Sequence, residues 1–403
     1  MTVRIAAYAM SDPNHFGGLH EVVAELVRAG AEVRFWTDRR FEDRVTSVGA
    51  GFVDIFAGHA LDDADNASRP LPSRFVTWAA ANGEEMIANA AIWRPDLVIY
   101  DGFALIGQLV AEALSVPRII VTAGHAIHGK FYRERLARDP RVKTDRRCHD
   151  AVERLRTEFA LPGASPFSYV ADPSPWLNVH IEPAEWLTAD ETLRLGPFAF
   201  FGSLPNGALN HERVAQNATT RIYVSFGTII WRYWPREALN ALAAIADGAG
   251  GLAETEVLIT LGGANVSEAD AAALRRPNVR VETFVDQQAA LAASDIFITH
   301  HGIGSTHEAI ALGVPMLSYP FFWDQPAIAA RAAEFGLALP LLQGALGRED
   351  RLTPSDVSAA ISSLEARRPQ MELAIGVARR WEETAMAERP RIARQIIALA
   401  NRN

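Results

Sequence analysis

One segment in the second half of the chain carries residue types that together suit a phosphate. An apolar run ends in a histidine, and two glycines and two hydroxyl residues follow, in the order His300, Gly302, Gly304, Ser305 and Thr306. The run predicts a buried strand, and the glycines allow the backbone to turn tightly and approach a ligand. Ser305 and Thr306 then open a predicted helix, where free N–H groups and the helix dipole favour an anion. His300 could donate a further hydrogen bond to that anion.

Carboxylate and amide groups follow the predicted phosphate site. Glu308 lies one turn into the same predicted helix, where it would repel phosphate but could accept hydrogen bonds from a ribose diol. Asp324 and Gln325 stand at the head of the next predicted helix, and such a pair suits a sugar with several hydroxyl groups. Taken alone, Ser305 is better explained as a helix-capping residue. The ordered set, however, favours a site for phosphate, ribose and sugar.

Alternating strand-like and helix-like segments must position these residues. In the first half, buried strands are predicted at 3–10, 32–37, 96–101 and 117–123. The alternation restarts after a stretch rich in Gly, Pro, Asn and Thr, and it predicts two doubly wound, Rossmann-like α/β domains with parallel sheets. Their expected boundaries are 1–200 and 220–384, with a linker at 201–219. Ligands bind at the carboxyl ends of parallel strands, so two such domains suit a reaction between two substrates in a cleft.

Composition limits the class of protein. The 403 residues, 49% of them hydrophobic, are enough for two domains with large cores. A net charge of -9 argues against an extended surface for nucleic acid. The single cysteine, Cys148, excludes an internal disulfide and a zinc site built on several thiolates. Neither a signal peptide nor a run of about 20 apolar residues is visible, so we expect a cytoplasmic protein without stable membrane insertion.

The region 284–330 resembles the nucleotide-sugar signature of the family 1 glycosyltransferases, which include bacterial natural-product and macrolide glycosyltransferases of the GT-B fold. The family pattern is an aromatic residue, Gln, His-x-Gly-x-x-Ser/Thr-x-x-Glu, Gly-x-Pro and Asp/Glu-Gln. It is matched here by Phe284, Gln287, His300, Gly302, Ser305, Glu308, Gly313, Pro315, Asp324 and Gln325. A second segment, SFGT, is similar to the family's phosphate-side loop and contains Ser225, Gly227 and Thr228.

The resemblance implies a role for each part of this donor site. The nucleotide base would stack on Phe284 and contact Val285 and Gln287. Phosphate would contact His300, Ser305 and neighbouring amides, ribose would bind Glu308, and the sugar hydroxyls would bind the Asp324–Gln325 pair. Two positions depart from the family. Phe284 replaces the Trp of plant members, and His301 stands where many members have a small residue, so its ring must either crowd the phosphates or point away.

The resemblance also implies a catalytic histidine in the first half. His15 follows the first predicted strand, where bacterial members have a Gly-His-Val-Asn-Pro turn before a helix. The family's histidine is the general base that deprotonates the acceptor hydroxyl, and neutral imidazole suits that task. Asp101, at the end of the predicted strand 96–101, is the candidate that orients it. The alternatives are a turn histidine bonded to the backbone and, for Asp101, a cap for the helix that starts at Gly102.

The acceptor side is less informative. Trp78, His125 and His128 are candidates for the acceptor pocket, although the tryptophan could equally be core and the histidines exposed loop residues. Asp63 and Asp65 match a short metal-binding Asp-x-Asp motif, but they lie in an acidic, turn-like run, and no metal site is predicted. Members of this fold send their last helix back onto the first domain, which is expected here for 385–403, with a break at Pro390.

The sequence therefore predicts an inverting, metal-independent transfer of a hexose from a nucleotide diphosphate sugar to a hydroxyl of a small molecule. The donor is expected to be UDP-linked, with a TDP-linked deoxysugar as the second option, and no further cofactor is predicted. Three alternatives remain: a nucleotide-sugar 2-epimerase of the same fold, a glycosyltransferase that acts on a lipid carrier, and a non-catalytic module that binds nucleotide sugars. A homodimer is compatible with the sequence.

Overall fold

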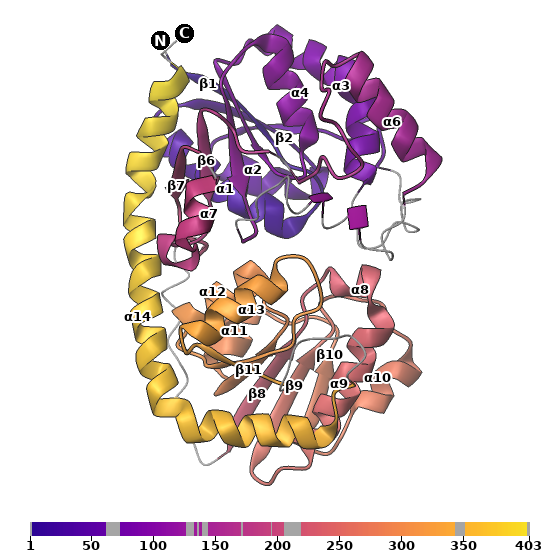
Figure 1. Ribbon diagram of the computed structural model, residues 1–403, viewed down its shortest axis with the longest axis vertical. Helices are drawn as coiled ribbons and strands as arrows, with labels where there is room; N and C mark the ends of the chain where they lie inside the picture. The colour runs from indigo at the N-terminus through magenta and orange to yellow at the C-terminus, as the bar shows by residue number, and fades with distance from the viewer. Residues whose placement is uncertain are drawn as a thin grey trace. The chain divides into compact units, whose positions relative to one another are not determined.

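The computed structural model describes residues 2–61, 73–125, 133–134, 137–138, 144–170, 172–194, 196–204, 219–342 and 351–400. The chain forms two compact units, each built around its own sheet (Figure 1). The N-terminal unit consists of Met1–Ser203 together with Thr384–Asn403, and the C-terminal unit consists of Leu204–Glu383.

The N-terminal unit has a seven-stranded sheet in the order β3-β2-β1-β4-β5-β6-β7, with every pair parallel. The strands are β1 (Arg4–Tyr8), β2 (Glu32–Thr37), β3 (Gly51–Asp54), β4 (Leu97–Asp101), β5 (Arg118–Thr122), β6 (Leu177–His180) and β7 (Phe198–Phe200). The helices are α1 (Pro13–Arg28), α2 (Glu42–Ser47), α3 (Arg74–Trp93), α4 (Leu105–Leu114), α6 (Arg146–Thr157) and α7 (Ala189–Arg194).

The C-terminal unit has a six-stranded parallel sheet in the order β10-β9-β8-β11-β12-β13. The strands are β8 (Thr220–Ser225), β9 (Thr255–Thr260), β10 (Val279–Glu282), β11 (Ile296–Thr299), β12 (Met316–Ser318) and β13 (Ala338–Pro340). The helices are α8 (Ile230–Tyr233), α9 (Pro235–Gly250), α10 (Glu268–Leu274), α11 (Gln287–Ala292), α12 (Ile303–Ala311), α13 (Gln325–Glu334) and α14 (Pro354–Ala400).

The predicted fold class, two doubly wound parallel sheets, is confirmed. In both units the first strand in sequence, β1 or β8, lies inside the sheet and pairs with strands on both sides. The strand order reverses there, so loops at the carboxyl ends of β1 and β4, and of β8 and β11, diverge and leave room for a ligand. His15 follows β1 and Asp101 ends β4, whereas Ser225 ends β8 and His300 follows β11.

Helix α1 begins earlier than the sequence pattern suggested, and this corrects the placement of His15. The prediction put His15 in a turn before the helix, but the helix already begins at Pro13. Asp12 is its N-cap and accepts hydrogen bonds from the backbone amides of Asn14 and His15. A capping Asp followed by Pro is a strong helix start. His15 therefore has a fixed backbone in the first helical turn.

Helix α14 is continuous from Pro354 to Ala400, so the predicted break at Pro390 is wrong. The helix bends sharply partway along its length (Figure 1). The last turns belong to the N-terminal unit, and Ile392, Ile396 and Leu399 are buried in its core.

Candidate active site

His15 and Asp101 form a hydrogen-bonded pair in the N-terminal unit. His15 Nδ1 lies 3.0 Å from Asp101 Oδ1, although the two residues are 86 positions apart. Parallel pairing of β1 with β4 brings them together, because Asp101 ends β4 and α1 follows β1 directly. A carboxylate that accepts from Nδ1–H leaves Nε2 of the imidazole unprotonated, and that nitrogen can take a proton.

The surroundings of the pair hold both side chains in place. Asp101 is fully buried, and its carboxylate also accepts from the backbone amides of Phe103 (2.8 Å) and Met10 (3.4 Å). The Phe103 ring stacks on His15, with centroids 3.6 Å apart and planes 17° from parallel. Asp101 does not cap α4, whose N-cap is Ala104. The sequence offered no signal for Phe103, since only the fold shows that its ring faces His15.

In the C-terminal unit, the imidazole of His300 lies against two glycine backbones. A Cβ atom on Gly227 would come within 2.7 Å of His300 Nε2, and one on Gly302 within 2.6 Å. Any larger residue at either position would displace the ring, which explains why both loops have glycine there. Burial lowers the pKa of His300 to about 4. The ring is therefore neutral near pH 7 and can donate a hydrogen bond without adding charge.

Helix α12 starts at Ile303, two residues before the predicted start, so the set of free amides changes. The first amides of a helix lack intrahelical partners, and here they belong to Ile303, Gly304 and Ser305. Thr306 was predicted to offer a free N–H, but its amide bonds to the Gly302 carbonyl at 3.0 Å. Its hydroxyl donates to the same carbonyl, and its side chain is fully buried. Thr306 therefore stabilises the loop that contains Gly302 from its buried side.

The side chain of His301 points into the interior of the C-terminal unit, so the ring points away from the predicted phosphate site and does not crowd it. Its Nδ1 lies 3.1 Å from the Thr306 hydroxyl and its Nε2 lies 2.7 Å from the Ser318 hydroxyl. Burial lowers the pKa of His301 to about 3, so the ring stays neutral. The residue has a φ of 61°, a left-handed conformation uncommon outside glycine. These contacts hold it there, and the ring leaves the phosphate loop open.

Three residues predicted to contact the nucleoside and phosphate lie together. Gln287 Nε2 donates to Glu308 Oε2 at 2.6 Å and to the Ser305 hydroxyl at 3.1 Å. Gln288 Nε2 lies 3.3 Å from the other carboxylate oxygen of Glu308. Burial raises the pKa of Glu308. Nearby, the ring of Phe284 is 71% exposed, which leaves it accessible to a planar partner such as a base.

We expect Glu308→Ala to weaken donor binding by about 1.5–3 kcal/mol, the range for a hydrogen bond to a charged group. Titration calorimetry with the sugar nucleotide measures this, and circular dichroism should barely change. Because burial raises the Glu308 pKa, wild-type affinity should already fall at mildly acidic pH, whereas Glu308→Gln should not show that fall. Gln288→Ala is the matched control, since it touches Glu308 but is not a predicted donor contact. An unchanged affinity in Glu308→Ala would remove this residue from the ribose site.

The Asp324–Gln325 pair lies at the start of α13, with Asp324 at the N-cap position. Gln325 is buried, and its Oε1 accepts from the backbone amides of Phe321 (2.9 Å) and Phe322 (3.2 Å). The carbonyl oxygen of this amide thus shapes the preceding loop. In the loop that follows β8, Ser225 is buried and its hydroxyl accepts from the Gly227 amide, while Thr228 is exposed.

Two of the three candidates for the acceptor pocket lie among the described residues, and both are buried. Trp78 is buried and donates from Nε1 to the His59 carbonyl at 2.7 Å, so it belongs to the packing of α3. His125 is also buried, and its Nδ1 lies 2.8 Å from Glu182 Oε1. It is not the exposed loop residue that was the alternative. His128, Asp63 and Asp65 lie outside the described residues.

Glu182 is a buried charge that sequence reasoning missed. The Glu182 carboxylate raises the pKa of His125 to about 10 against the opposing effect of burial. Glu191, on α7, lies 3.5 Å from the other ring nitrogen of His125. The partners are 57 and 66 residues away from the histidine, and only the pairing of β5 with β6 brings the loop of Glu182 beside that of His125. No local pattern marks such a pair.

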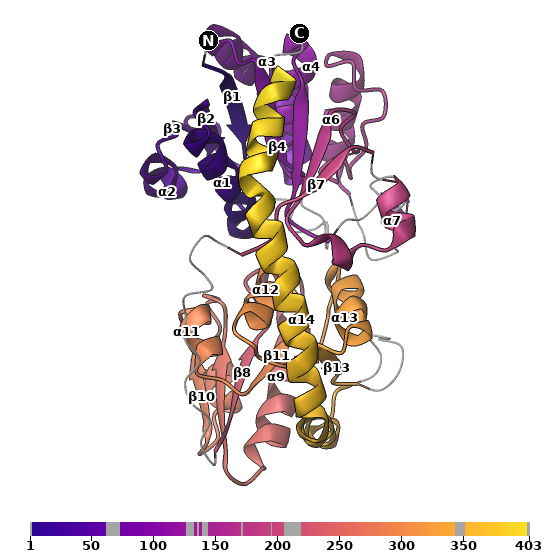
Figure 2. The ribbon, with the colours of Figure 1, turned by 90° about the vertical axis from the view of Figure 1, so that its left-hand side faces the viewer.

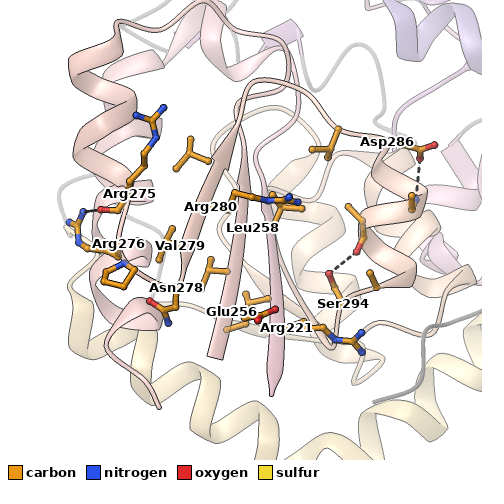
Figure 3. A pocket seen from close by; sticks show the side chains of 18 residues that line it. Arg221, Glu256, Leu258, Arg275, Arg276, Asn278, Val279, Arg280, Asp286 and Ser294 are labelled. Atoms are coloured by element: carbon orange, nitrogen blue, oxygen red, sulfur yellow. Dashed lines mark hydrogen bonds between the residues drawn. The ribbon is translucent and has the colours of Figure 1, made fainter. Parts of the chain in front are cut away.

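A pocket of about 890 Å³ lies over β8, β9 and β10 and is flanked by α11 (Figure 3). Of the predicted donor residues it includes only Val285. Its arginines are already paired with carboxylates, as Arg221 is with Asp295 and Arg276 with Asp247. The pocket therefore lies beside the predicted donor loops. Because its arginines already have carboxylate partners, we do not assign it to a phosphate.

Within the described ranges, no group of three or more His, Cys, Asp or Glu side chains is arranged to hold a metal ion. None of the helices in those ranges is both long and apolar enough to cross a membrane.

The chain is similar to known proteins both in sequence and in fold. The models of the two domains of erythromycin biosynthesis protein CIII-like proteins match residues 68–177 (N-terminal domain) and 245–399 (C-terminal domain), well over half of the chain. The NDP-glycosyltransferase YjiC of Bacillus subtilis (strain 168) is 27% identical over 73% of this chain and 71% of its own. The solved structure of the calicheamicin glycosyltransferase CalG4 is similar with a TM-score of 0.72 and 22% identity, over 100% of this chain and 99% of that one. The glycosyltransferase VinC in complex with dTDP is similar with a TM-score of 0.65 and 21% identity, over the full length of both chains.

Proposed function

Because this chain belongs to the family 1 glycosyltransferases of the GT-B fold that act on natural products, we propose that it moves a hexose from a nucleotide diphosphate sugar to a hydroxyl of a small natural-product acceptor, with inversion at the anomeric carbon. It is a nucleotide-sugar-dependent enzyme. The observation that carries the proposed mechanism is the hydrogen bond between His15 and Asp101.

In this mechanism His15 is the general base. Asp101 accepts from Nδ1–H, which leaves Nε2 as the unprotonated, basic nitrogen, and Nε2 takes the proton of the acceptor hydroxyl. The acceptor oxygen attacks the anomeric carbon, and the bond from that carbon to the nucleotide diphosphate breaks. Asp101 then stabilises the imidazolium that has formed, as a carboxylate does in other histidine–carboxylate pairs.

The leaving diphosphate is stabilised on the C-terminal unit. We assign this task to neutral His300, to the Ser305 hydroxyl and to the first amides of α12. These groups are preorganised, so they need not reorient as negative charge develops on the leaving diphosphate. The helix N-terminus also contributes a positive potential.

UDP-hexose is the proposed donor, and Asp324 with the free end of the Gln325 amide would hold its hydroxyl groups. A TDP-linked sugar is the second candidate, because the structurally similar VinC was solved with dTDP bound. The test is mass spectrometry of an acceptor panel incubated with UDP-glucose and with dTDP-glucose. We expect an acceptor heavier by one hexose together with free nucleotide diphosphate. A nucleotide sugar epimerised in the absence of acceptor would contradict the proposal and indicate an epimerase.

We expect transfer to survive a metal chelator. In this proposal the amides of α12, the helix dipole and His300 compensate the negative charge of the diphosphate, so no divalent cation is required for that purpose. The measurement compares initial rates with and without excess EDTA. Abolition of activity by EDTA, with recovery on addition of manganese, would contradict the expectation and direct attention to Asp63 and Asp65.

A further inference from the structure

A buried polar pair joins helix α12 to helix α14 inside the C-terminal unit. His307 Nδ1 contacts Glu382 Oε1, and the two side chains are 0% and 1% exposed. His307 lies between Thr306 and Glu308 in the sequence, so it belongs to the helix proposed to bind the phosphate and ribose. Ser305 and Glu308, three residues apart, share one face of α12, and His307 is turned away from Ser305 by about 200° on the helix. The pair therefore contacts α12 on the side of the helix opposite Ser305.

The neighbouring residue of α14 contacts the other donor helix. The ring of Trp381 packs edge-on against Phe335, with centroids 4.9 Å apart. Phe335 caps the carboxyl end of α13, and Asp324 and Gln325 open the same helix. Two successive residues of α14 therefore contact α12 and α13, the helices proposed to bind the phosphate and the sugar. Figure 2 shows α14 passing both helices.

Stability alone does not explain a polar pair at this place. Replacing a buried charged or polar pair with well-packed apolar residues is often neutral or stabilising, because no desolvation cost remains. A polar pair, however, is directional and allows few arrangements of the two helices. An apolar contact would allow α12 to rotate or slide, and such a shift would move the amides of α12 and Glu308 relative to the start of α13.

We propose that Glu382 and His307 are positioning residues that fix α12 relative to α13 through α14, so that phosphate and sugar are held in one geometry. This inference rests on the proposed function, because it assigns α12 and α13 to the donor. The pair acts through the helices and contacts neither the acceptor nor the reacting atoms. Its loss should therefore weaken binding of the sugar nucleotide and leave the acceptor KM unchanged.

The test measures the Kd of UDP-glucose and of dTDP-glucose by calorimetry on the full chain, together with Tm and the KM of each substrate, because in this proposal only the sugar nucleotide contacts both helices. The double variant His307→Leu/Glu382→Leu should keep a Tm near or above that of wild type, yet raise the Kd by about 10-fold, the order expected for misplaced binding groups. In His307→Asn the side-chain amide can replace Nδ1, so the Kd should stay within about 3-fold of wild type. The control is Arg379→Gln/Glu383→Gln, a half-exposed pair on the same helix, for which no change is expected.

An unchanged Kd in the folded double variant would overturn the proposal, because a role in stability alone moves Tm and not nucleotide affinity. If the double variant does not fold, Glu382→Met carries the same test, because it removes the acceptor oxygens at a similar side-chain length: its Kd should rise by about 10-fold, and a Kd within about 3-fold of wild type again overturns the inference. Failure of the proposed function would look different. Wild-type protein would then bind neither UDP-glucose nor dTDP-glucose.

Discussion

His15→Ala should lower kcat by about two to four orders of magnitude, the usual contribution of a positioned general base. The reason is geometric: Asp101 and the stacked Phe103 ring fix the imidazole so that Nε2 is the unprotonated nitrogen. Donor binding should not change, because the residues proposed to bind the nucleotide belong to the C-terminal unit and His15 belongs to the N-terminal unit. Steady-state kinetics gives kcat, and calorimetry with UDP gives the unchanged affinity.

Two further variants separate a base from a residue that only positions the acceptor. Asp101→Asn should lose less than His15→Ala, and the double variant should be little worse than His15→Ala, because residues that act as one unit are not additive. A phenol or thiol acceptor, partly ionised at assay pH, should recover more activity in His15→Ala than an aliphatic alcohol does. Equal losses for both acceptor types would indicate positioning, and full activity would place the base elsewhere.

His300→Ala should lower kcat/KM by roughly 10²–10³, the cost of removing one preorganised hydrogen-bond donor from a developing anion. The His300 ring lies against the backbones of Gly227 and Gly302, at the carboxyl ends of β8 and β11. Its loss removes the hydrogen-bond donor that is proposed to stabilise the leaving diphosphate. Initial rates over a range of donor concentrations give the ratio.

The pH dependence distinguishes the two histidines. Burial lowers the pKa of His300 to about 4, so this ring is already neutral over the usual assay range and cannot cause a fall in rate between pH 5 and 7. At saturating donor, where the protonation of Glu308 no longer limits binding, a fall in kcat toward acidic pH should therefore persist in His300→Ala and disappear in His15→Ala, because protonation of a base removes its function. Loss of the acidic limb in His300→Ala would show that the roles are assigned wrongly.

Local sequence patterns predicted the fold class and most of the proposed donor site. Apolar runs such as those that became β4 and β11 are continuous because both faces of a parallel sheet are buried, so they are visible without a structure. The polar residues that follow β11 come in a fixed order, and one short helix holds Ser305 and Glu308 on one face. Near neighbours in sequence remain neighbours in space there.

The missed features depend on residues far apart in sequence or on short elements. Strands β3, β7 and β13 are short and only partly buried, and Asn178 and His180 interrupt the apolar residues of β6, so these strands lack the continuous buried apolar run of β11. The start of α12 was placed two residues late, because a glycine at the N-cap resembles a loop residue. The pairs His125–Glu182 and His307–Glu382 become visible only once the strands and helices have packed.

The most direct test of the mechanism is the anomeric configuration of the product, read from the coupling of the anomeric proton by NMR. With UDP-glucose as donor, a single displacement assisted by His15 inverts the centre, so the α-configured donor should give a β-glucoside. An α-glucoside would contradict the account, because retention needs two displacements or a front-face reaction in which His15 has no place as the base.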